Sequence, residues 1–217
     1  MTPAEYDAWY DTDRGRWIGE TEYRLLSAML APSHGESVLD VGCGTGWFAR
    51  RMAADGPSRL TGVDLDFPSL AFAHQRRADI ACVEADACRL PFGDNSFERV
   101  MSVAALNFVA DWPQALAEIV RVANRRFAVG LLHRHSLLWL AKGREDDDGD
   151  YRGAHWHSRR EILGALTGLP VEHVRIRSAV LFPGGSPMAR FAERHLPQTV
   201  PFGALIVVAA DKRHDGV

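Results

Sequence analysis

The sequence predicts an α/β protein built around one mostly parallel β-sheet. Short apolar runs alternate along the chain with segments of helical composition, and their spacing leaves room for crossover helices. This alternation is typical of parallel sheets covered by helices. The 217 residues are 47% hydrophobic and contain no linker-like or repeated segment. We therefore expect a single domain with one sizeable core.

Five apolar runs are the predicted central strands, and three segments between them are the predicted crossover helices. The strands are expected at residues 38–41, 60–63, 80–83, 100–103 and 127–132, and the helices at residues 47–54, 69–76 and 111–122. The last of these helices has Asp111 as a plausible N-cap and Pro113 in its first turn. Before the first strand, apolar side chains recur at helical spacing and predict an amphipathic helix on the sheet: Trp17, Ile18, Thr21, Leu25 and Met29.

The last third of the chain has a different pattern. Residues 171–181 and 204–210 are rich in β-formers and are expected to pair antiparallel at one edge of the sheet. A short helix is expected to begin at Ser186-Pro187, and Ser158-Arg-Arg-Glu161 is a capping box that predicts another helix start.

Composition narrows the range of partners. The 25 Lys and Arg against 28 Asp and Glu give a net charge of −3, so no overall basic field favours nucleic acid. The apolar run 203–210 is far shorter than the roughly 20 residues of a membrane-spanning helix. Three cysteines and the absence of an apolar signal core after Met1 indicate a cytoplasmic protein. A small-molecule partner is the expectation.

The strongest motif is the strand and glycine-dense turn Val-Leu-Asp-Val-Gly-Cys-Gly-Thr-Gly at residues 38–46. Glycine is needed where a backbone turns tightly or approaches a ligand, and the following helix N-terminus offers free amide donors. The spacing G-x-G-x-G differs from the dinucleotide pattern G-x-G-x-x-G, and Asp40 precedes the first glycine. A carboxylate there repels a pyrophosphate and suits a sulfonium or ammonium group, so a sulfonium nucleoside fits better than NAD.

Acidic residues also follow the next two predicted strands. Asp64 comes 22 residues after Gly42, where a carboxylate can accept the hydroxyl hydrogens of a ribose. Asp86, in Glu84-Ala-Asp-Ala, can accept from an adenine amino group. Each is alone compatible with an ordinary loop acid, but three acids at one sheet edge favour a binding crevice.

These motifs, together with Leu-Pro-Phe-Gly-Asp-Asn-Ser-Phe-Glu-Arg-Val at residues 90–100, resemble those of class I S-adenosylmethionine-dependent methyltransferases, in the branch of the ubiquinone and menaquinone biosynthesis enzymes (methyltransferase type 11). The resemblance implies a Rossmann-like seven-stranded sheet with helices on both faces and an antiparallel last strand. It implies that Asp40 and the glycine turn hold the methionine part of the cofactor, Asp64 the ribose, and Asp86 with the Ala87 backbone the adenine. The expected cofactor-binding residues are Tyr10, Arg16, Trp17, Asp40, Gly42, Cys43, Gly44, Gly46, Asp64, Leu65, Asp86, Ala87 and Val103.

The sequence departs from the family pattern in two places. Residues 121–126 read Arg-Val-Ala-Asn-Arg-Arg where the family usually has Pro-Gly-Gly, which leaves the start of the fifth strand open. Asn107 stands where many relatives have His, and we assign it, with Trp156, to substrate binding.

The aromatic-rich N-terminus is expected to form a lid, with Tyr10, Arg16 and Trp17 as its functional residues. The alternative is that Trp9 and Trp17 simply pack the N-terminal helix on the core. The corresponding division of the domain is a helical lid at 1–36, a cofactor-binding half at 37–135 and a substrate-side half at 136–217.

Two histidine pairs are candidates for a general base: His133, His135, His155 and His157. The alternatives are a metal site or hydrogen-bonded loop histidines, and we assign no metal. The acidic run 144–150 is expected to be a solvated insert, and the cysteines are expected to pack rather than react.

The resulting hypothesis is methyl transfer from S-adenosylmethionine to O, N or activated C of a small molecule, with S-adenosylhomocysteine as the product. Two alternatives stay open at this point: an S-adenosylmethionine-binding regulatory or scaffold protein without turnover, and an RNA or protein methyltransferase. A homodimer is compatible with either.

Overall fold

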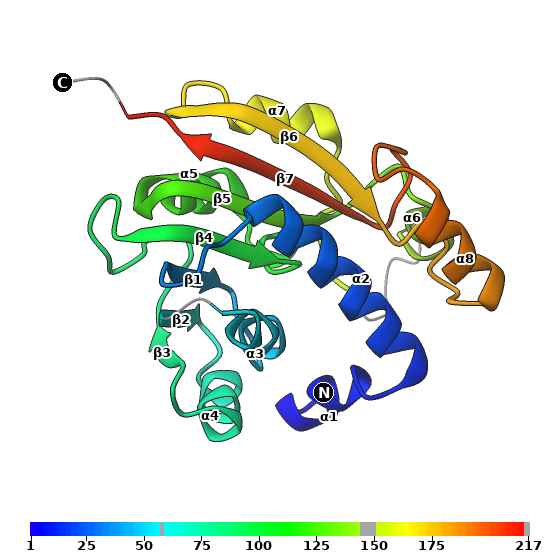
Figure 1. The fold of residues 1–217 in the computed structure, drawn as a ribbon, viewed down its shortest axis with the longest axis horizontal. Helices are drawn as coiled ribbons and strands as arrows, with labels where there is room; N and C mark the ends of the chain where they lie inside the picture. Colours follow the sequence, from blue (N-terminus) through cyan, green and yellow to red (C-terminus); the bar gives the residue numbers. More distant parts are fainter. Residues whose placement is uncertain (57–58, 144–150, 215–217) are drawn as a thin grey trace.

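The computed structural model describes residues 1–56, 59–143 and 151–214, and these build one seven-stranded sheet in the order β3-β2-β1-β4-β5-β7-β6 (Figure 1). The first five strands are parallel, while β7 runs antiparallel to both β5 and β6. The strands are β1 Ser37–Val41, β2 Arg59–Asp64, β3 Ala81–Glu84, β4 Phe97–Val103, β5 Ala123–Leu132, β6 Val171–Ala179 and β7 Leu205–Lys212. The expected fold class, including the antiparallel last strand, is confirmed.

Helices cover both faces of the sheet. On one face α2 and α3 pack on a core formed with the inner strands, and on the other face α5 and α7 pack on a second core. The helices are α1 Pro3–Trp9, α2 Asp13–Leu30, α3 Trp47–Ala54, α4 Phe67–Arg76, α5 Trp112–Val122, α6 Leu137–Lys142, α7 Arg159–Ala165 and α8 Pro187–His195, with a 3₁₀ turn at Leu106–Phe108. None of the helices in the described ranges has the length and apolarity of a membrane-crossing helix.

The three helix N-caps that the sequence predicts are present in the structure. Asp111 accepts a hydrogen bond from the backbone N–H of Gln114, Ser186 accepts from Ala189, and Ser158 forms the capping box with Glu161. The helix α4 begins two residues earlier than expected, because Asp66 is its N-cap and Pro68 lies in its first turn. The acidic run 144–150 lies outside the described residues.

The strand β5 begins four residues earlier than the sequence predicts. The helix α5 ends at Val122, and Ala123 already pairs with Phe97 of β4, so helix and strand join without a separate glycine turn. Next to this early start, the pairing register of β4 with β5 shifts between Phe97 and Arg99.

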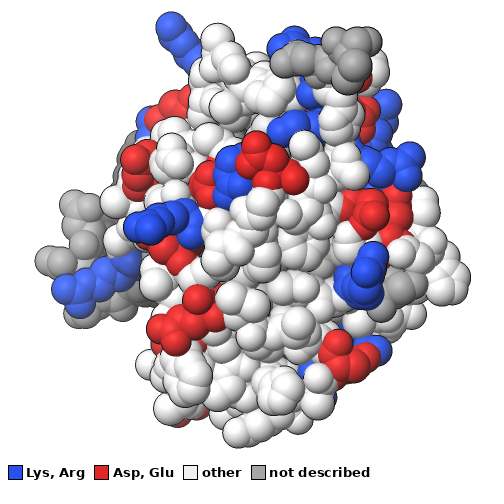
Figure 2. Space-filling model, turned by 90° about the vertical axis from the view of Figure 1, so that its left-hand side faces the viewer, with Lys and Arg blue, Asp and Glu red and all other residues white. Residues whose placement is uncertain are grey.

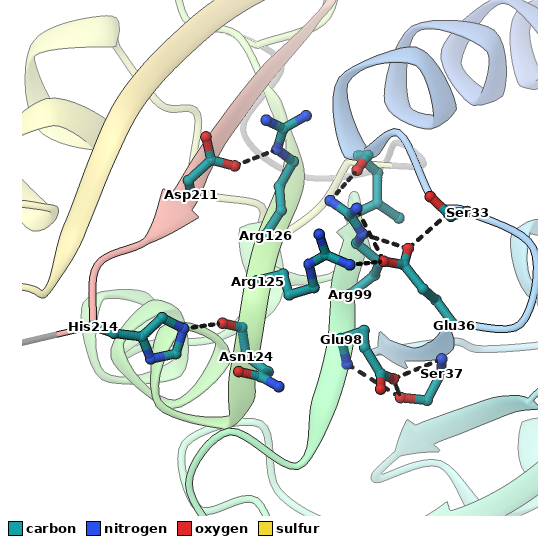
Figure 3. A network of polar contacts seen from close by, with 11 residues as sticks. Ser33, Glu36, Ser37, Glu98, Arg99, Asn124, Arg125, Arg126, Asp211 and His214 are labelled. Atoms are coloured by element: carbon teal, nitrogen blue, oxygen red, sulfur yellow. Dashed lines mark hydrogen bonds and ion pairs between the residues drawn. The ribbon is translucent and has the colours of Figure 1, made fainter.

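The edge where the parallel strands begin is held by ion pairs (Figure 3). Glu36 accepts two hydrogen bonds from the Arg99 guanidinium, at 2.7 and 3.2 Å, and one from Arg125 at 2.9 Å. The Glu36 and Arg99 side chains are only 8% and 9% exposed. Arg126 pairs with Asp211 in the same hollow. Both carboxylates, Glu36 and Asp211, are therefore paired with guanidinium groups here.

The surface seen in Figure 2 carries Lys and Arg interspersed with Asp and Glu, without a continuous basic patch. On this face the distribution agrees with the small net charge and shows no positive strip of the kind that binds a nucleic-acid backbone.

We expect Glu36→Gln to lower the free energy of unfolding by about 3 kcal/mol, because it leaves the buried Arg99 guanidinium without its counter-charge. Burial opposes ionisation of Glu36, but hydrogen bonds from Arg99 and Ser33 and the charges of Arg99 and Arg125 lower its pKa overall. The contribution should therefore be present above the ordinary carboxyl pKa and be lost as the pH falls below it. Urea unfolding at neutral and acidic pH measures both effects.

The matched control is Glu20→Gln, which removes a half-exposed pair with Arg51 and should cost no more than about 1 kcal/mol. Equal losses in the two variants would contradict the structural role given to Glu36.

Candidate functional site

The glycine turn lies where β1 ends, and backbone hydrogen bonds fasten it to the end of β2. The N–H groups of Gly42 and Cys43 both donate to the carbonyl of Val63, at 2.7 and 2.9 Å. The strand order reverses at β1, with β2 on one side and β4 on the other. Open α/β sheets bind ligands in the crevice at such a point.

Two glycines of the turn have positive φ, a backbone conformation that residues with a side chain rarely adopt. Gly42 has φ +72°, and a Cβ there would lie 2.2 Å from the Cβ of Ala105. Gly44 has φ +52°, and a Cβ there would meet no atom within 4 Å. The space over Gly44 is therefore open to a ligand that approaches the backbone closely.

Asp64 binds the turn and keeps it in place. One carboxylate oxygen accepts from the N–H of Gly44 at 2.7 Å, and the other accepts from the N–H of Asp66 at 3.0 Å. Each oxygen keeps further acceptor capacity, because a carboxylate offers about four lone-pair sites. Asp64 is thus placed to contact a ligand lying on Gly44.

Asp40 is the most unusual polar residue of the site. It is 2% exposed, and its Oδ2 atom has no hydrogen-bond partner among the described residues. Burial, assisted by the nearby charge of Asp64, raises the pKa of Asp40 to about 8. A cationic ligand would satisfy this oxygen and favour the ionised carboxylate.

Aromatic side chains close the space above the turn. Tyr10 stacks on Trp47, with ring centroids 4.4 Å apart, and Tyr6 lies edge-on to Tyr10. A narrow cavity remains beneath these rings, lined by Tyr6, Tyr10, Asp40, Gly42, Cys43, Gly44, Thr45, Trp47, Phe48 and Val103. Five of the expected cofactor residues besides Tyr10 are therefore brought together here.

The helix α1 is tied down over this cavity by one buried carboxylate. Asp7 accepts from the Thr45 hydroxyl at 2.9 Å and from the Arg50 guanidinium at 2.7 Å, with Arg76 at 3.8 Å. Thr45 and Arg50 belong to the glycine turn and to α3. Hydrogen bonds through Asp7 therefore join the helix α1, which covers the cavity, to the glycine turn and α3.

Gly46, Leu65, Asp86 and Ala87 are not among the residues that line the cavity. Gly46 is the N-cap of α3, Leu65 is 65% exposed just beyond β2, and Asp86 is exposed beyond β3. Asp86 accepts from the N–H of Cys88 at 2.9 Å, and Ala87 is half-buried beside it. The roles given to these residues stay predictions.

Arg16 and Trp17, expected in the lid, do not line the cavity. Arg16 is exposed and donates to the carbonyl of Asp11, while Trp17 lies against Gly185 and under the guanidinium of Arg190. Trp17 therefore packs α2 against the start of α8, and it also borders the core that contains α2. The roles given to Arg16 and Trp17 stay predictions.

The two histidine pairs meet through the backbone but not as one cluster. His133 and His157 form an isolated β-bridge, and His133 Nδ1 lies 3.2 Å from the carbonyl of Gly203. The rings of His155 and His157 are 4.5 Å apart, and His157 packs edge-on against Trp112 of α5. None of the four is among the residues lining the cavity.

Burial of His157, with the neighbouring His155, lowers its pKa to about 3, so its ring is neutral near pH 7. Both of its ring nitrogens lack hydrogen-bond partners among the described residues. Those residues contain no group of three or more His, Cys, Asp or Glu able to hold a metal ion. The base role stays a prediction.

Asn107 and Trp156 are both buried. Both polar atoms of the Asn107 amide are engaged with the backbone, since Nδ2 donates to the Ala104 carbonyl and Oδ1 accepts from the N–H of Leu132. Asn107 thereby links the carboxyl ends of β4 and β5. Trp156 packs in the core that contains α2, and the substrate roles of both residues stay predictions.

Sequence reasoning missed several residues of the site. Tyr6, Thr45 and Phe48 line the cavity, Trp47 was noted only as a helix start, and Asp7 anchors the cover.

The fold and turn define a cofactor-binding α/β protein whose buried acid, Asp40, suits a cationic nucleoside. The sequence model described as "Methyltransferase domain" matches residues 39–126. A demethylmenaquinone methyltransferase from Roseiflexus sp. is 33% identical over 199 residues, which cover 83% of this chain and 77% of that protein. The chain belongs to the class I S-adenosylmethionine-dependent methyltransferase family.

Two further comparisons extend this result. A malonyl-[acyl-carrier protein] O-methyltransferase from Erwinia pyrifoliae is 40% identical over 120 residues, covering 52% of this chain and 45% of that protein. The chain thus spans less than half the length of several curated relatives that it matches. A methyltransferase structure from Thermotoga maritima, described as a possible histamine N-methyltransferase, shares the fold with a TM-score of 0.79 and 21% identity, covering 97% of this chain and 95% of that one.

We expect Asp64→Ala to weaken binding of S-adenosylmethionine by about 1 to 3 kcal/mol, because a hydrogen-bond acceptor and the brace on Gly44 are both lost. Titration calorimetry measures the affinity. Asp66→Ala is the control, since it removes the cap of α4 and leaves the turn attached. Unchanged affinity in Asp64→Ala would contradict the assignment.

We expect Gly44→Ala to reduce affinity for S-adenosylmethionine at least tenfold, since its Cβ would occupy the space through which a ligand reaches the backbone. Gly168→Ala is matched in strain, because Gly168 also has positive φ and open surroundings but lies beyond α7. Thermal unfolding should show a similar small decrease of the melting temperature in both variants. Titration calorimetry should show weaker binding of S-adenosylmethionine only in Gly44→Ala. Equal affinities would mean that no ligand lies on Gly44.

Proposed function

We propose that this protein transfers a methyl group from S-adenosylmethionine to a small-molecule acceptor. The observation that carries the proposal is the buried Asp40, whose Oδ2 atom is unpartnered at the end of the central strand, beside an open glycine. An uncompensated buried carboxylate is costly, and it marks a site where a ligand supplies the compensation.

The residues present fit the cofactor. Asp40 and the turn at Gly42 and Gly44 would hold its cationic methionine part, and Asp64 would accept from the ribose hydroxyls. Asp86, with the backbone of Ala87, would receive the adenine at the end of β3. Asp40 and Asp64 lie at the carboxyl ends of β1 and β2, and Asp86 follows β3, the next strand in the sheet, which supports this assignment.

When bound, the cofactor supplies an electrophilic methyl group: the acceptor's lone pair bonds to the methyl carbon while the C–S electron pair stays on sulfur. The protein's part is to orient the acceptor in line with that bond and to exclude water. The cover of Tyr6, Tyr10 and Trp47 suits the second task. Because only a narrow cavity remains beneath it, α1 must shift for a cofactor to enter.

A small acceptor is supported by this tight aromatic cover and by the mixed charges of the surface in Figure 2. The relatives named above act, by their names, on a carrier-bound malonyl group and on demethylmenaquinone, and the structural neighbour is a possible histamine N-methyltransferase. These names differ in their acceptors and include both O- and N-methylation, so they define no common acceptor.

The test begins with titration calorimetry of the purified protein against S-adenosylmethionine, S-adenosylhomocysteine and NAD. We expect both sulfur ligands to bind and NAD not to bind, and we expect Asp40→Asn to lose affinity at least tenfold. Mass spectrometry then detects transfer of a deuterated methyl group to a panel of amines, phenols and quinols.

Binding of NAD alone, or of none of the three ligands, would overturn the cofactor assignment. Tight binding of S-adenosylmethionine without transfer to any acceptor class would favour the regulatory or scaffold alternative.

A further inference from the structure

A hollow of about 360 Å³ lies at the edge where the parallel strands begin, on the opposite side of the sheet from the glycine turn (Figure 3). Cavities that bind small organic molecules have volumes of roughly 300 Å³ or more. The lining comes from the end of α2, from β4, β5 and β7, and from the segment after β7: Ala31, Arg99, Asn124, Arg125, Arg126, Asp211, Lys212 and His214. The hollow therefore has room for a small molecule.

The charges of the hollow do not balance. Four of its lining side chains are Lys or Arg, and Asp211 is the acid among them. Glu36 adjoins the hollow and adds a second carboxylate, which is paired with two of the arginines. Glu98 is not among the lining residues, and its carboxylate accepts from the backbone N–H of Ser37 (Figure 3). Two positive charges of the lining therefore have no carboxylate to match them.

Two guanidinium groups of the hollow have unused hydrogen-bond donors. Arg126 donates to Asp211 through Nε, and Arg125 donates to Glu36 through one terminal nitrogen. Their other guanidinium nitrogens make no hydrogen bond within residues 1–56, 59–143 and 151–214. The Arg126 side chain is only 21% exposed and is held by Asp211, so its two free terminal nitrogens have a fixed orientation.

These donors come from the segment 121–126, where the sequence departs from the family pattern. Because α5 runs into β5 without a glycine turn, this segment carries Asn124, Arg125 and Arg126 on backbone that belongs to the sheet. Arg126 lies opposite Arg99 of β4 on one side and Asp211 of β7 on the other. A Pro-Gly-Gly turn would place no charged side chain there. The departure thus supplies the basic lining of the hollow.

We propose that this hollow is a second ligand site and that it binds the phosphate group of a small phosphate monoester. Such a group carries about −1.5 to −2 charges at neutral pH, which matches the two unpaired positive charges of the lining. Guanidinium groups bind phosphate oxygens through pairs of N–H donors, and Arg125 and Arg126 have such donors free. A carboxylate ligand, with a single charge, would leave one positive charge unmatched.

This site is separate from the cavity over Gly44, and it goes beyond the proposed function. The two cavities share no lining residue and lie at opposite edges of the sheet. A nucleic-acid backbone needs a longer basic strip than one hollow, and the face drawn in Figure 2 has no such strip. The charge and the dimensions of the hollow therefore favour a small molecule.

The experiment titrates phenyl phosphate and phenyl sulfate into the purified protein by calorimetry at pH 8 and low ionic strength. The two probes have nearly the same shape, but only the phosphate has a second negative charge at this pH. We expect phenyl phosphate to bind at least tenfold more tightly than phenyl sulfate. It should also raise the melting temperature, since a ligand that binds only the folded state stabilises it.

Two variants test the residues of the hollow. Arg126→Gln should weaken phenyl phosphate binding at least tenfold, and Arg125→Gln should weaken it at least fivefold. The Arg125 side chain is 61% exposed, so its replacement leaves the fold intact. The matched control is Arg51→Gln, which also removes a guanidinium paired with a carboxylate but lies on α3, away from the hollow. It should bind phenyl phosphate like the unmodified protein.

The proposal is overturned if phenyl phosphate does not bind at millimolar concentration, or if phenyl sulfate binds as tightly. It is also overturned if Arg51→Gln weakens binding as much as the two variants of the hollow, because general attraction of anions would then explain the result. Tighter binding of a short single-stranded oligonucleotide than of phenyl phosphate would contradict the small-molecule assignment. None of these outcomes bears on the titrations with S-adenosylmethionine, so the proposed function is tested independently.

Discussion

The attachment of the glycine turn to the end of β2 positions the rest of the site. Two backbone N–H groups of the turn share the carbonyl of Val63, and a third donates to Asp64. The turn therefore cannot shift without breaking the link between β1 and β2. Because Thr45 and Arg50 follow the turn and bind Asp7, the cover α1 is placed by the same attachment.

One carboxyl group of the cavity is buried without compensation. Asp40 lines the cavity near the end of β1, and its Oδ2 atom has no hydrogen-bond partner among the described residues. Burial raises its pKa to about 8. Proteins rarely retain such a group unless a ligand uses it, since burial of an unpaired charge is unfavourable. In the proposed function, this acid faces the cofactor's cationic part.

The charged cluster at the opposite edge of the sheet shows the contrasting case. Glu36 is also buried, but two guanidinium groups and a backbone N–H hold it, and its pKa is lowered rather than raised. The difference lies in the partners and not in the depth of burial. Matched charges join the segment before β1 to β4 and β5 there, whereas the buried Asp40 at the ligand-binding edge has an unmatched carboxylate oxygen.

The sequence by itself determined the order along the chain of the strands and of the helices other than α1 and α6, the caps at Asp111, Ser158 and Ser186, and the turn with Asp40 and Asp64, because all of these depend on local spacing and backbone geometry. The sequence did not predict the early start of β5, since pairing with β4 decided that boundary. Only the tertiary structure placed His157 against Trp112 rather than in the cavity, engaged the Asn107 amide with the backbone, and brought Tyr6 and Asp7 to the turn. Those placements join segments distant in sequence, and side-chain direction across such contacts is set by packing rather than by local pattern.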